Sequence, residues 1–458
     1  MTIVYKRKLV ITKNIYTMSF IKKKTYEQHD NELGSFYKSS IKSFQKADIL
    51  ENNFNTDICV IGGGLTGISS ALHLAKNGYS VALFEARKIG WGASGRNGGQ
   101  LGIGMRKDQR TIEKKLGFNH AKELWNIGLE AVDVSKKLIS DYKIDCNLQK
   151  GVISAGYYKN DRDDFLEDID HMNKIYNFDG YKFLDEDEIH EEIKTNIYYS
   201  GLLNKFSYHI NPLKFLISLA NELKNLNVKV YENTPITEIF EDTDGIKIKS
   251  QKKIINCRRL VVGCNGYLDN LLGNLRNKFM PINNYIIATE PLGEKKAKEI
   301  IKNNYAVSDT RFIIDYYRFS EDWRMLFGGG ETYTSRFIND SKNFVWKRMC
   351  SVFPILKNCK IEYSWGGTLA ITVNRLPSFG TLMNDKIIYA HGYSGHGLAL
   401  STMAGKLISE KISGNNERFN FLANIKNLSI PGGDFFRRPI YASAVGYYKI
   451  KDKLRLLI

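Results

Sequence analysis

The feature that most constrains the fold is a run of glycines between an apolar segment and a stretch with helical periodicity. Residues 57–61, Asp-Ile-Cys-Val-Ile, have the pattern of a buried parallel strand. Gly62–Gly67 follow, and residues 68–77 then carry an apolar stripe with the spacing of a helix. A second apolar segment, residues 80–84, ends at Glu85. Strand, glycine turn, helix and strand within about thirty residues predict one βαβ unit.

Each glycine has a physical role if this turn binds a dinucleotide. Gly62 permits the tight turn out of the strand, Gly64 lets backbone N–H groups approach a pyrophosphate, and Gly67 allows the helix to pack closely on the strand. The N-terminus of the helix that follows faces the phosphates with its partial positive charge. The carboxylate that ends the second strand can accept hydrogen bonds from a ribose, which disfavours NADP. The turn predicts a Rossmann-type α/β fold but does not distinguish FAD from NAD.

Two further glycine-rich segments favour a flavin. The segment Gly90–Gly104 places Ser94, Arg96 and Asn97 among glycines, which is typical of backbone that passes close to a flat group or a phosphate. The segment Gly392–Gly397 follows an apolar strand and precedes a helix, so its N–H groups can face the O2/N1 edge of a flavin. The alternatives are a flexible surface loop for the first segment and an ordinary strand–helix turn for the second.

Together with motifs elsewhere in the chain, these segments resemble the D-amino-acid-oxidase/sarcosine-oxidase class of FAD enzymes, and within it the gamma-glutamylputrescine-oxidising branch. The resemblance extends from about Ser35 to near the C-terminus. Its motifs are Ser35–Tyr37, Trp91–Gln100, Asp315–Arg318, Phe327–Gly330, Arg375–Gly380, Tyr393–Gly397, Pro431–Gly433 and Tyr447-Tyr448. The Asp-Tyr-Tyr-Arg and C-terminal motifs are more selective than the glycine fingerprint, which many proteins share.

The resemblance implies a discontinuous Rossmann-type FAD-binding domain and an α+β substrate domain on a mixed β-sheet. The FAD-binding domain is predicted to comprise residues 55–105, 197–270 and 364–412, and the substrate domain residues 106–196 and 271–363. Residues 413–458 are expected to form a C-terminal tail that packs on the body. Residues 1–33 are expected to be a disordered basic extension, with a targeting segment or a start at Met18 as alternatives.

The same resemblance predicts which residues bind FAD. They are Gly62, Gly64, Leu65, Thr66, Gly67, Glu85, Ala86, Arg87, Gly92, Ala93, Ser94, Arg96, Asn97, Gly98, Gly99, Gln100, Ile236, Gly263, Gly266, Gly395, His396 and Gly397. Some relatives attach FAD covalently through a cysteine, but residues 369–373 contain none, so noncovalent binding is expected.

The activity implied is oxidation of an amine to an imine, hydrolysis to the aldehyde and ammonia, and reoxidation of the flavin by oxygen with release of hydrogen peroxide. The expected substrate is gamma-glutamylputrescine or a similar amine. Sarcosine oxidases carry a lysine that pairs with the substrate carboxylate where this chain has Ala399. A small α-amino acid would therefore lose a charged partner worth about 1.5–3 kcal/mol. This favours an amine whose carboxylate lies far from the reacting carbon.

Hydride transfer needs a neutral amine, so an apolar, aromatic pocket is expected to lower the pKa of the bound amine. The candidate catalytic side chains are Tyr316, Arg318, Trp365 and His396. Tyr316 and Tyr317 alternate on a predicted strand, so one of the two can face the flavin. Arg318 is a candidate for holding a distal substrate carboxylate, and His396 for placing a positive charge beside the flavin. Each also has a purely structural interpretation as a core residue, a surface ion pair or a turn histidine.

Composition narrows the possible partners and compartment. The formal net charge of +17 is compatible with nucleic-acid or membrane binding, but lysines spread over solvated faces explain it equally well. The chain has no recognisable RNA-binding motif and no apolar run of membrane-spanning length. The cysteines form no CxxC pair and the histidines no HExxH motif, so no metal is predicted and a cytoplasmic protein is expected.

Three other functions stay open from the sequence, of which the simplest is a flavin-binding module without turnover. Another is an amino-acid or N-methyl-amine dehydrogenase that passes electrons to an acceptor other than oxygen. The third is a basic FAD protein that binds or acts on RNA. The sequence predicts no oligomeric state.

Overall fold

The computed structural model describes residues 34–44, 47–269, 271–332 and 337–430, with isolated positions at 439, 443 and 446. The basic extension predicted for residues 1–33 lies outside the described residues. So do the C-terminal motifs Pro431–Gly433 and Tyr447-Tyr448 and most of the predicted tail beyond residue 430.

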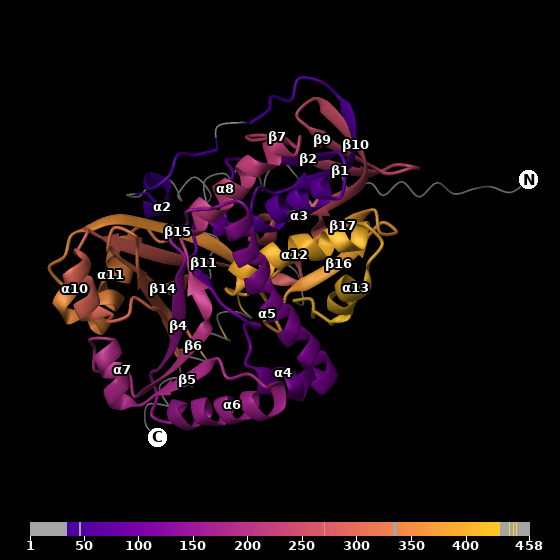
Figure 1. The fold of residues 1–458 in the computed structure, drawn as a ribbon. Helices are drawn as coiled ribbons and strands as arrows, with labels where there is room; N and C mark the ends of the chain where they lie inside the picture. Colours follow the sequence, from indigo (N-terminus) through magenta and orange to yellow (C-terminus); the bar gives the residue numbers. More distant parts are fainter. Residues whose placement is uncertain are drawn as a thin grey trace, which may run out of the picture.

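The first of two sheets is the parallel sheet that the glycine fingerprint predicts (Figure 1). Its strand order is β16 (Ser378–Leu382), β17 (Ile387–His391), β10 (Lys253–Val262), β1 (Phe54–Ile61), β2 (Val81–Phe84) and β7 (Lys229–Tyr231). β16 is antiparallel to β17, and a ribbon of β8 (Glu238–Glu241) and β9 (Ile246–Ser250) extends from β10. β2 and the second half of β1 are buried, as strands covered on both faces must be.

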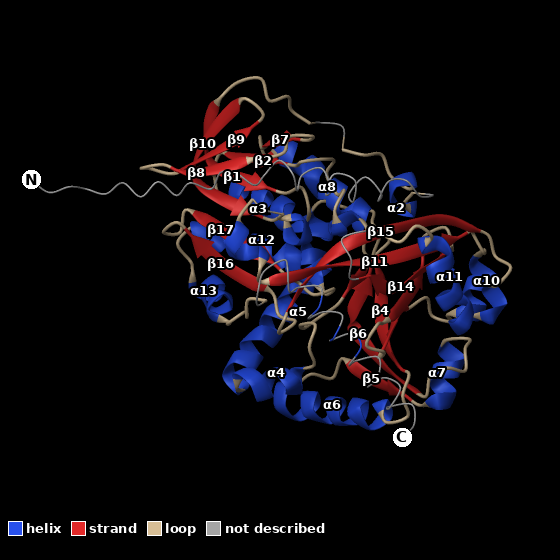
Figure 2. Ribbon diagram, turned by 180° about the vertical axis from the view of Figure 1, so that it is seen from behind, coloured by secondary structure: helices blue, strands red, loops and turns tan. Residues whose placement is uncertain are grey.

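The second sheet is mixed and lies beside the first (Figure 2). Its order is β15 (Ile361–Thr372), β11 (Phe279–Thr289), β14 (Met325–Thr332), β13 (Asp315–Phe319), β12 (Ala306–Asp309), β4 (Gln149–Gly156), β6 (Ser200–His209) and β3 (Gln100–Leu101), with β5 (Tyr181–Leu184) paired to β6. β12 and β4 are parallel, whereas the other neighbours are antiparallel. The predicted fold, a Rossmann-type domain with a second domain on a mixed sheet, is confirmed.

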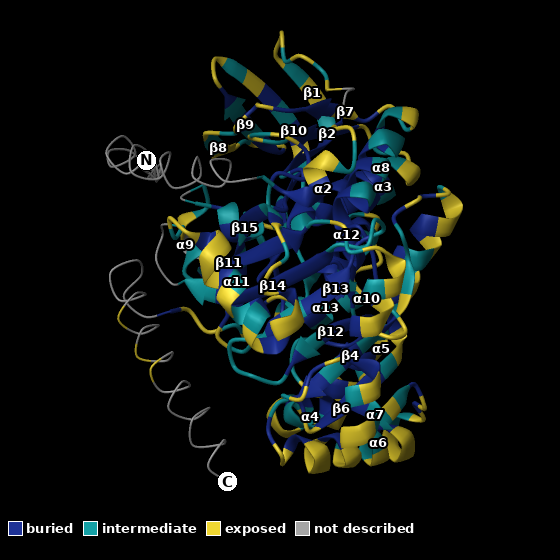
Figure 3. Ribbon diagram, turned by 90° about the vertical axis from the view of Figure 1, so that its left-hand side faces the viewer, coloured by how far each residue is buried: buried dark blue, intermediate teal, exposed yellow. Residues whose placement is uncertain are grey.

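Helices cover both sheets and separate them (Figure 1). Their bounds are α2 (Phe36–Ser39), α3 (Leu65–Lys76), α4 (Gln109–Leu116), α5 (Phe118–Asp141), α6 (Asp161–Tyr176), α7 (Glu186–Glu192), α8 (Pro212–Asn225), α9 (Gly273–Arg276), α10 (Glu294–Ile300), α11 (Ser341–Val352), α12 (Gly397–Ile412) and α13 (Glu417–Asn424). Short 3-10 helices are η2 (Ala93–Gly95), η3 (Asn265–Tyr267) and η4 (Pro354–Leu356). α12 packs between α3 and α5, and Figure 3 shows this central region as buried while α6 exposes its outer face.

The two sheets divide the chain differently from the predicted domain segments at β3, β6 and β15, and β3, within residues 55–105 assigned to the FAD-binding domain, pairs with β6 in the mixed sheet. β6 lies within residues 197–270, which were assigned to the FAD-binding domain, but it pairs with β4 in the mixed sheet. β15 includes residues 364–372, assigned to the same domain, and pairs with β11 over its whole length. Figure 2 shows β15 and β11 crossing from the mixed sheet toward the parallel sheet. The end of β15 contacts the third glycine segment, where the Ser394 N–H donates to the Ala370 carbonyl at 3.1 Å.

Two buried histidines should make the free energy of unfolding fall strongly at acid pH. Burial lowers the pKa of His209 and of His391 to about 3, assisted by the charge of Arg318 and of Lys278 respectively. The unfolded chain binds protons at these sites below pH ~6.5, whereas the folded chain does not. The free energy of unfolding is therefore expected to fall by roughly 1.4 kcal/mol per pH unit for each histidine as the pH drops from 6.5 toward 3. Urea midpoints at about pH 7.5 and about pH 5.5 measure this slope.

His391→Phe provides the matched control, because the ring stacks on Tyr389 at 5.1 Å and meets the edge of Phe279 at 4.9 Å. A phenyl ring keeps both contacts and cannot be protonated. The variant should lose less stability than the natural protein between the two pH values. Equal losses would show that His391 does not contribute to the acid sensitivity.

Candidate functional site

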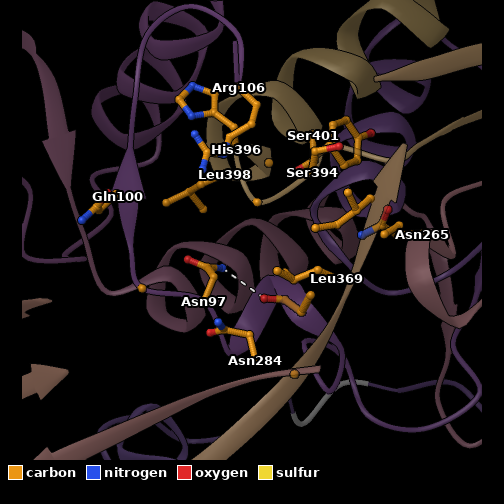
Figure 4. A pocket seen from close by; sticks show the side chains of 18 of the residues that line it. Asn97, Gln100, Arg106, Asn265, Asn284, Leu369, Ser394, His396, Leu398 and Ser401 are labelled. Atoms are coloured by element: carbon orange, nitrogen blue, oxygen red, sulfur yellow. Dashed lines mark hydrogen bonds between the residues drawn. The ribbon is translucent and has the colours of Figure 1, made fainter. Parts of the chain in front are cut away.

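A large cavity lies where the three glycine-rich segments meet the mixed sheet. It contains about 1500 Å³ of empty space, part of it open to solvent. The first segment contributes Leu65 and Thr66 at the start of α3. The second contributes Ala93, Ser94, Arg96, Asn97, Gly98 and Gln100, and the third Tyr393, Ser394, Gly395, His396 and Gly397. Figure 4 shows side chains from these separate parts of the chain around one open centre. Segments more than 300 residues apart in sequence thus form one site.

Two helices begin at this cavity without a side-chain cap from their own N-cap residue. The N-cap of α3 is Gly64 and that of α12 is His396, and neither side chain accepts a hydrogen bond from its helix. The first N–H groups of a helix have no partner within it and carry a partial positive charge. The two starts are joined by a hydrogen bond of 2.7 Å between the hydroxyls of Thr66 and Tyr393. This arrangement suits anionic or electron-rich groups of a ligand.

The fingerprint turn is packed too tightly for any residue larger than glycine at its third position. A Cβ atom on Gly67 would lie 1.9 Å from the Gly62 carbonyl oxygen. Glu85 supports the turn from the second strand, because its carboxylate accepts hydrogen bonds from the Gly63 N–H at 2.6 Å and the Arg87 N–H at 2.8 Å. Burial raises the pKa of this carboxyl group, and the two N–H donors oppose that shift. The hydroxyl of Ser94 accepts from the Leu65 N–H at 3.0 Å.

Arg96 attaches the second glycine segment to β15. Its buried guanidinium donates to the Trp91 carbonyl at 2.6 Å and the Gly366 carbonyl at 3.3 Å. The indole N–H of Trp365 donates to the Arg96 carbonyl at 3.0 Å. Within the segment, the Asn97 amide donates to the Ser94 carbonyl at 2.9 Å. These bonds fix the backbone that forms one wall of the cavity.

The other predicted cofactor residues do not all reach the cavity. Gly263 lines it, whereas Gly62, Gly64, Gly67, Glu85, Ala86, Arg87, Gly92, Gly99, Ile236 and Gly266 do not. Most of these build the turns behind the lining residues. Ile236 instead packs against the apolar core of the parallel sheet, away from the described cavity.

Tyr316 is the aromatic side chain that the Asp-Tyr-Tyr-Arg motif brings to the cavity. Its ring lies between two glycines: a Cβ atom on Gly98 would lie 2.6 Å from it, and one on Gly328 only 2.1 Å. Its hydroxyl donates to the Asn284 side chain, and burial raises its pKa, so it stays protonated. Tyr317 points to the opposite face of β13 and stacks on Phe327 at 5.4 Å. The alternation therefore selects Tyr316.

Arg318 does not serve as the predicted carboxylate ligand. Its side chain is 2% exposed and does not line the described cavity. The guanidinium donates to the carbonyls of Gly98 at 2.8 Å, Phe319 at 3.0 Å and Ile210 at 2.7 Å, and to the Tyr37 hydroxyl at 3.1 Å. All three nitrogens are thus occupied by the protein. Arg318 thus holds the second glycine segment, and its side chain does not reach the described cavity.

Trp365 and His396 also differ from their predicted roles. Trp365 is 1% exposed, packs edge-on against Tyr37 at 5.4 Å, and lies behind the cavity wall. His396 does line the cavity, but burial, followed by the charge of Arg106, lowers its pKa to about 4. It contacts the Ile103 carbonyl through Nε2 at 3.0 Å. A neutral imidazole at neutral pH cannot supply the predicted positive charge.

Sequence reasoning missed several polar lining residues. The most prominent are Arg106, Asn265, Asn284, Glu331 and Arg375. Arg106, Glu331 and Arg375 directly follow or begin motifs noted in the sequence, so proximity to a motif was the available signal. Asn284 lies inside β11, where nothing in its neighbours indicates a site.

These features fit FAD. Helix starts without a cap from their own N-cap residue suit phosphates, the closely packed glycine turns suit a flat ring system, and the charged lining side chains are three arginines against one glutamate, Arg96, Arg106, Arg375 and Glu331, among the described residues. No cysteine lines the described cavity, and burial raises the pKa of the nearby Cys264 thiol to about 12.

Comparison with known proteins assigns the chain to a family. The model of the family described as FAD dependent oxidoreductase, the D-amino-acid-oxidase type, matches residues 57–411, which include all three glycine segments. The chain belongs to this family, and it is an FAD-dependent oxidoreductase.

Among its relatives, the chain is 36% identical to gamma-glutamylputrescine oxidoreductase of Escherichia coli (strain K12), covering 92% of this chain and 98% of the relative. It is 33% identical to a probable oxidoreductase of Haemophilus influenzae, covering 94% and 99% respectively. Its fold matches the crystal structure of glycine oxidase from Geobacillus kaustophilus with a TM-score of 0.68 at 18% identity, over 81% of this chain and 99% of that one. The predicted resemblance is confirmed.

Two features are absent from the described residues. Within those ranges, no helix is long and apolar enough to cross a membrane. The same part of the chain contains no cluster of three or more His, Cys, Asp or Glu side chains that could hold a metal ion.

Proposed function

We propose that this protein oxidises the terminal primary amine of gamma-glutamylputrescine, or of a closely similar gamma-glutamylated diamine, with molecular oxygen as the electron acceptor. The observation that carries the proposal is the 36% identity to gamma-glutamylputrescine oxidoreductase of Escherichia coli over nearly the full length of both chains. The cavity supports it, because three glycine segments and aromatic side chains of the mixed sheet meet there.

The reaction balances without a nucleophile or metal from the protein. The carbon next to nitrogen gives up a hydride and the nitrogen gives up a proton, so the C–N bond becomes the C=N bond of an imine. FAD, held at the starts of α3 and α12, would supply the acceptor for this hydride, and oxygen would take up the two electrons with two protons to leave as hydrogen peroxide. Water adds to the imine carbon, the C–N bond breaks, and the aldehyde and ammonia leave.

The residues of the cavity contribute binding and desolvation. Phe312, Ile314, Tyr316, Leu369 and Ile371 give it an apolar wall. Desolvation lowers the pKa of a bound amine, which favours the neutral form that can release a hydride. We propose that the starts of α3 and α12 and the intervening glycine segment hold FAD noncovalently, as their N–H groups and close-packed turns suggest.

Anaerobic titration tests the substrate. Adding gamma-glutamylputrescine to the purified yellow protein without air should abolish the visible flavin absorbance, with one substrate consumed per flavin. Putrescine, glycine and sarcosine serve as matched amines that lack the glutamyl group, and they should bleach the flavin at least about tenfold more slowly. Faster bleaching by glycine or sarcosine than by gamma-glutamylputrescine would contradict the proposal and favour an amino-acid oxidising enzyme.

An oxygen electrode tests the acceptor separately. Gamma-glutamylputrescine should cause oxygen uptake and an equal amount of hydrogen peroxide. Flavin bleaching without oxygen uptake would keep the substrate and replace oxygen by a quinone or a protein acceptor.

A further inference from the structure

Two arginines line the cavity on the side formed with the mixed sheet. Arg106 lies in the loop between β3 and α4, and Arg375 lies in the turn between β15 and β16. Burial is the largest cause that lowers the pKa of the Arg106 guanidinium, and the positive charge of Arg375 is the next. The two positive charges therefore repel one another. Glu331 of β14 opposes this shift and lines the same cavity. One carboxylate against two guanidinium groups leaves an excess positive charge.

Neither guanidinium has a hydrogen bond or ion pair to another described residue. This separates the pair from Arg96, whose guanidinium donates to two backbone carbonyls. It also separates them from Arg318, which donates to three carbonyls and one hydroxyl. Side chains of arginine carry five N–H donors, and leaving them without an acceptor next to another cation is costly. An anion in the cavity would satisfy both groups.

The turn that carries Arg375 is held in a conformation that few non-glycine residues adopt. Arg375 has a φ of +64°, in the left-handed region. Its N–H donates to the Thr372 carbonyl at 3.2 Å, and the Thr372 hydroxyl donates to the Leu376 carbonyl at 2.7 Å. The guanidinium carbon lies 5.8 Å from the ring centre of Phe312, another cavity residue. Strained backbone of this kind, fixed by surrounding bonds, is common at ligand-binding positions.

We propose that Arg106 and Arg375 together bind the substrate carboxylate that lies remote from the reacting carbon. This inference rests on the proposed function, since the glutamyl group of the substrate carries such a carboxylate at the far end from the terminal amine. It replaces the role predicted for Arg318. It also accounts for Ala399, because the carboxylate partner in this chain comes from the mixed-sheet side of the cavity and not from α12.

The position of the pair distinguishes this role from binding the phosphates of FAD. The phosphate site of this fold is the glycine turn at the start of α3. Arg106 and Arg375 instead lie with Phe312 and Glu331, which belong to the mixed sheet and its connections. Figure 4 shows Arg106 and His396 on one side of the cavity, across from Asn97 and Asn284.

Substrate pairs provide the sharpest test. Arg106→Met and Arg375→Met should each raise the KM for gamma-glutamylputrescine by about tenfold to a hundredfold, the effect of losing a hydrogen bond to a charged group. The kcat should stay within about threefold, because the reacting carbon is not contacted. N-(4-aminobutanoyl)putrescine is the same amide without the carboxylate. Its KM with the natural protein should already be as high as the KM of the variants for gamma-glutamylputrescine. Neither substitution should raise the KM for this amide further. Arg162→Met, at a side chain 61% exposed on α6, should match the natural protein.

Three results would overturn the inference. Equal losses with both amides would indicate a general structural effect. Weaker FAD binding by the methionine variants, measured by flavin release on dilution, would assign the arginines to the cofactor. Unchanged kinetics would show that they contact neither ligand.

A binding measurement keeps this test independent of turnover. L-Glutamine has the same α-amino group, α-carboxylate and γ-amide but lacks the aminobutyl chain that carries the reacting carbon, so calorimetry with the FAD-bound protein should detect binding that Arg106→Met and Arg375→Met abolish. If the natural protein binds L-glutamine in this way but does not oxidise gamma-glutamylputrescine, the proposed function fails and the carboxylate site stands. If it oxidises the substrate but the variants bind L-glutamine equally well, the carboxylate site fails alone.

Discussion

Gly67→Ala is expected to yield a protein without FAD and without amine oxidation. The added methyl group would lie 1.9 Å from the Gly62 carbonyl oxygen, and both positions are backbone, so no flexible side chain can move aside. The helix start must shift away from the strand, which displaces Leu65, Thr66 and the N–H groups of the first turn of α3 from the cavity. Because such groups must face phosphate at hydrogen-bond distance, FAD binding should fall by at least about a hundredfold. The flavin-to-protein ratio after purification, with and without added FAD, measures it.

Gly273→Ala is the matched control, since a Cβ atom on Gly273 meets nothing within 4 Å. This variant should retain FAD at the ratio of the natural protein. Far-ultraviolet circular dichroism distinguishes a folded, colourless Gly67→Ala protein from an unfolded one. A yellow Gly67→Ala protein with the natural flavin ratio would contradict the tight turn described here.

Arg318→Met is expected to lower the free energy of unfolding by about 2–5 kcal/mol, because buried carbonyls lose charged donors that methionine cannot replace. Gly98, Phe319, Ile210 and Tyr37 are the affected partners. In the fraction that folds, the ratio of KM values for gamma-glutamylputrescine and its decarboxylated amide should be that of the natural protein. Denaturant unfolding and steady-state kinetics with both amides measure the two effects.

Unfolding and kinetic measurements together distinguish an Arg318 that positions the backbone from an Arg318 that binds substrate. If Arg318 did bind the carboxylate, its replacement would bring the two KM values together, as expected for Arg106→Met and Arg375→Met. Arg318→Lys offers a second comparison, since lysine keeps the charge but cannot reach several carbonyls at once in a planar fork. It should recover only part of the lost stability.

The βαβ unit and the aromatic residue of β13 were predictable because each depends on local order in the chain. Glycine spacing between two apolar runs leaves few alternatives to the observed turn, and strand alternation separates Tyr316 from Tyr317. Arg318 shares the strand face of Tyr316, and the motif suggested it as a ligand for a substrate carboxylate, whereas the structure shows it donating to the Gly98 carbonyl of the second glycine segment. The motif gave no means to tell a guanidinium that binds carbonyls from one that binds a ligand.

The carboxylate pair could not be predicted for a different reason. Arg106 and Arg375 lie in connections without periodicity, after strands at opposite ends of the mixed sheet, β3 and β15, and only the folded chain brings both to one cavity. His396 was placed in the cavity correctly, but its protonation depends on burial and on Arg106, neither of which is written in the local sequence. Composition, motif and period indicate which segments matter, whereas charge state and partner choice depend on packing.

The glycines on either side of the Tyr316 ring limit how this enzyme can change during evolution. Any larger residue at position 98 or 328 would displace the ring and the backbone that carries Asn97, so a new substrate preference cannot arise there without disturbing the cofactor. Phe312 and Glu331 line the same cavity but do not pack against the Tyr316 ring as those glycines do. Homologues that act on other amines should therefore differ at these two positions while retaining the tyrosine between its glycines.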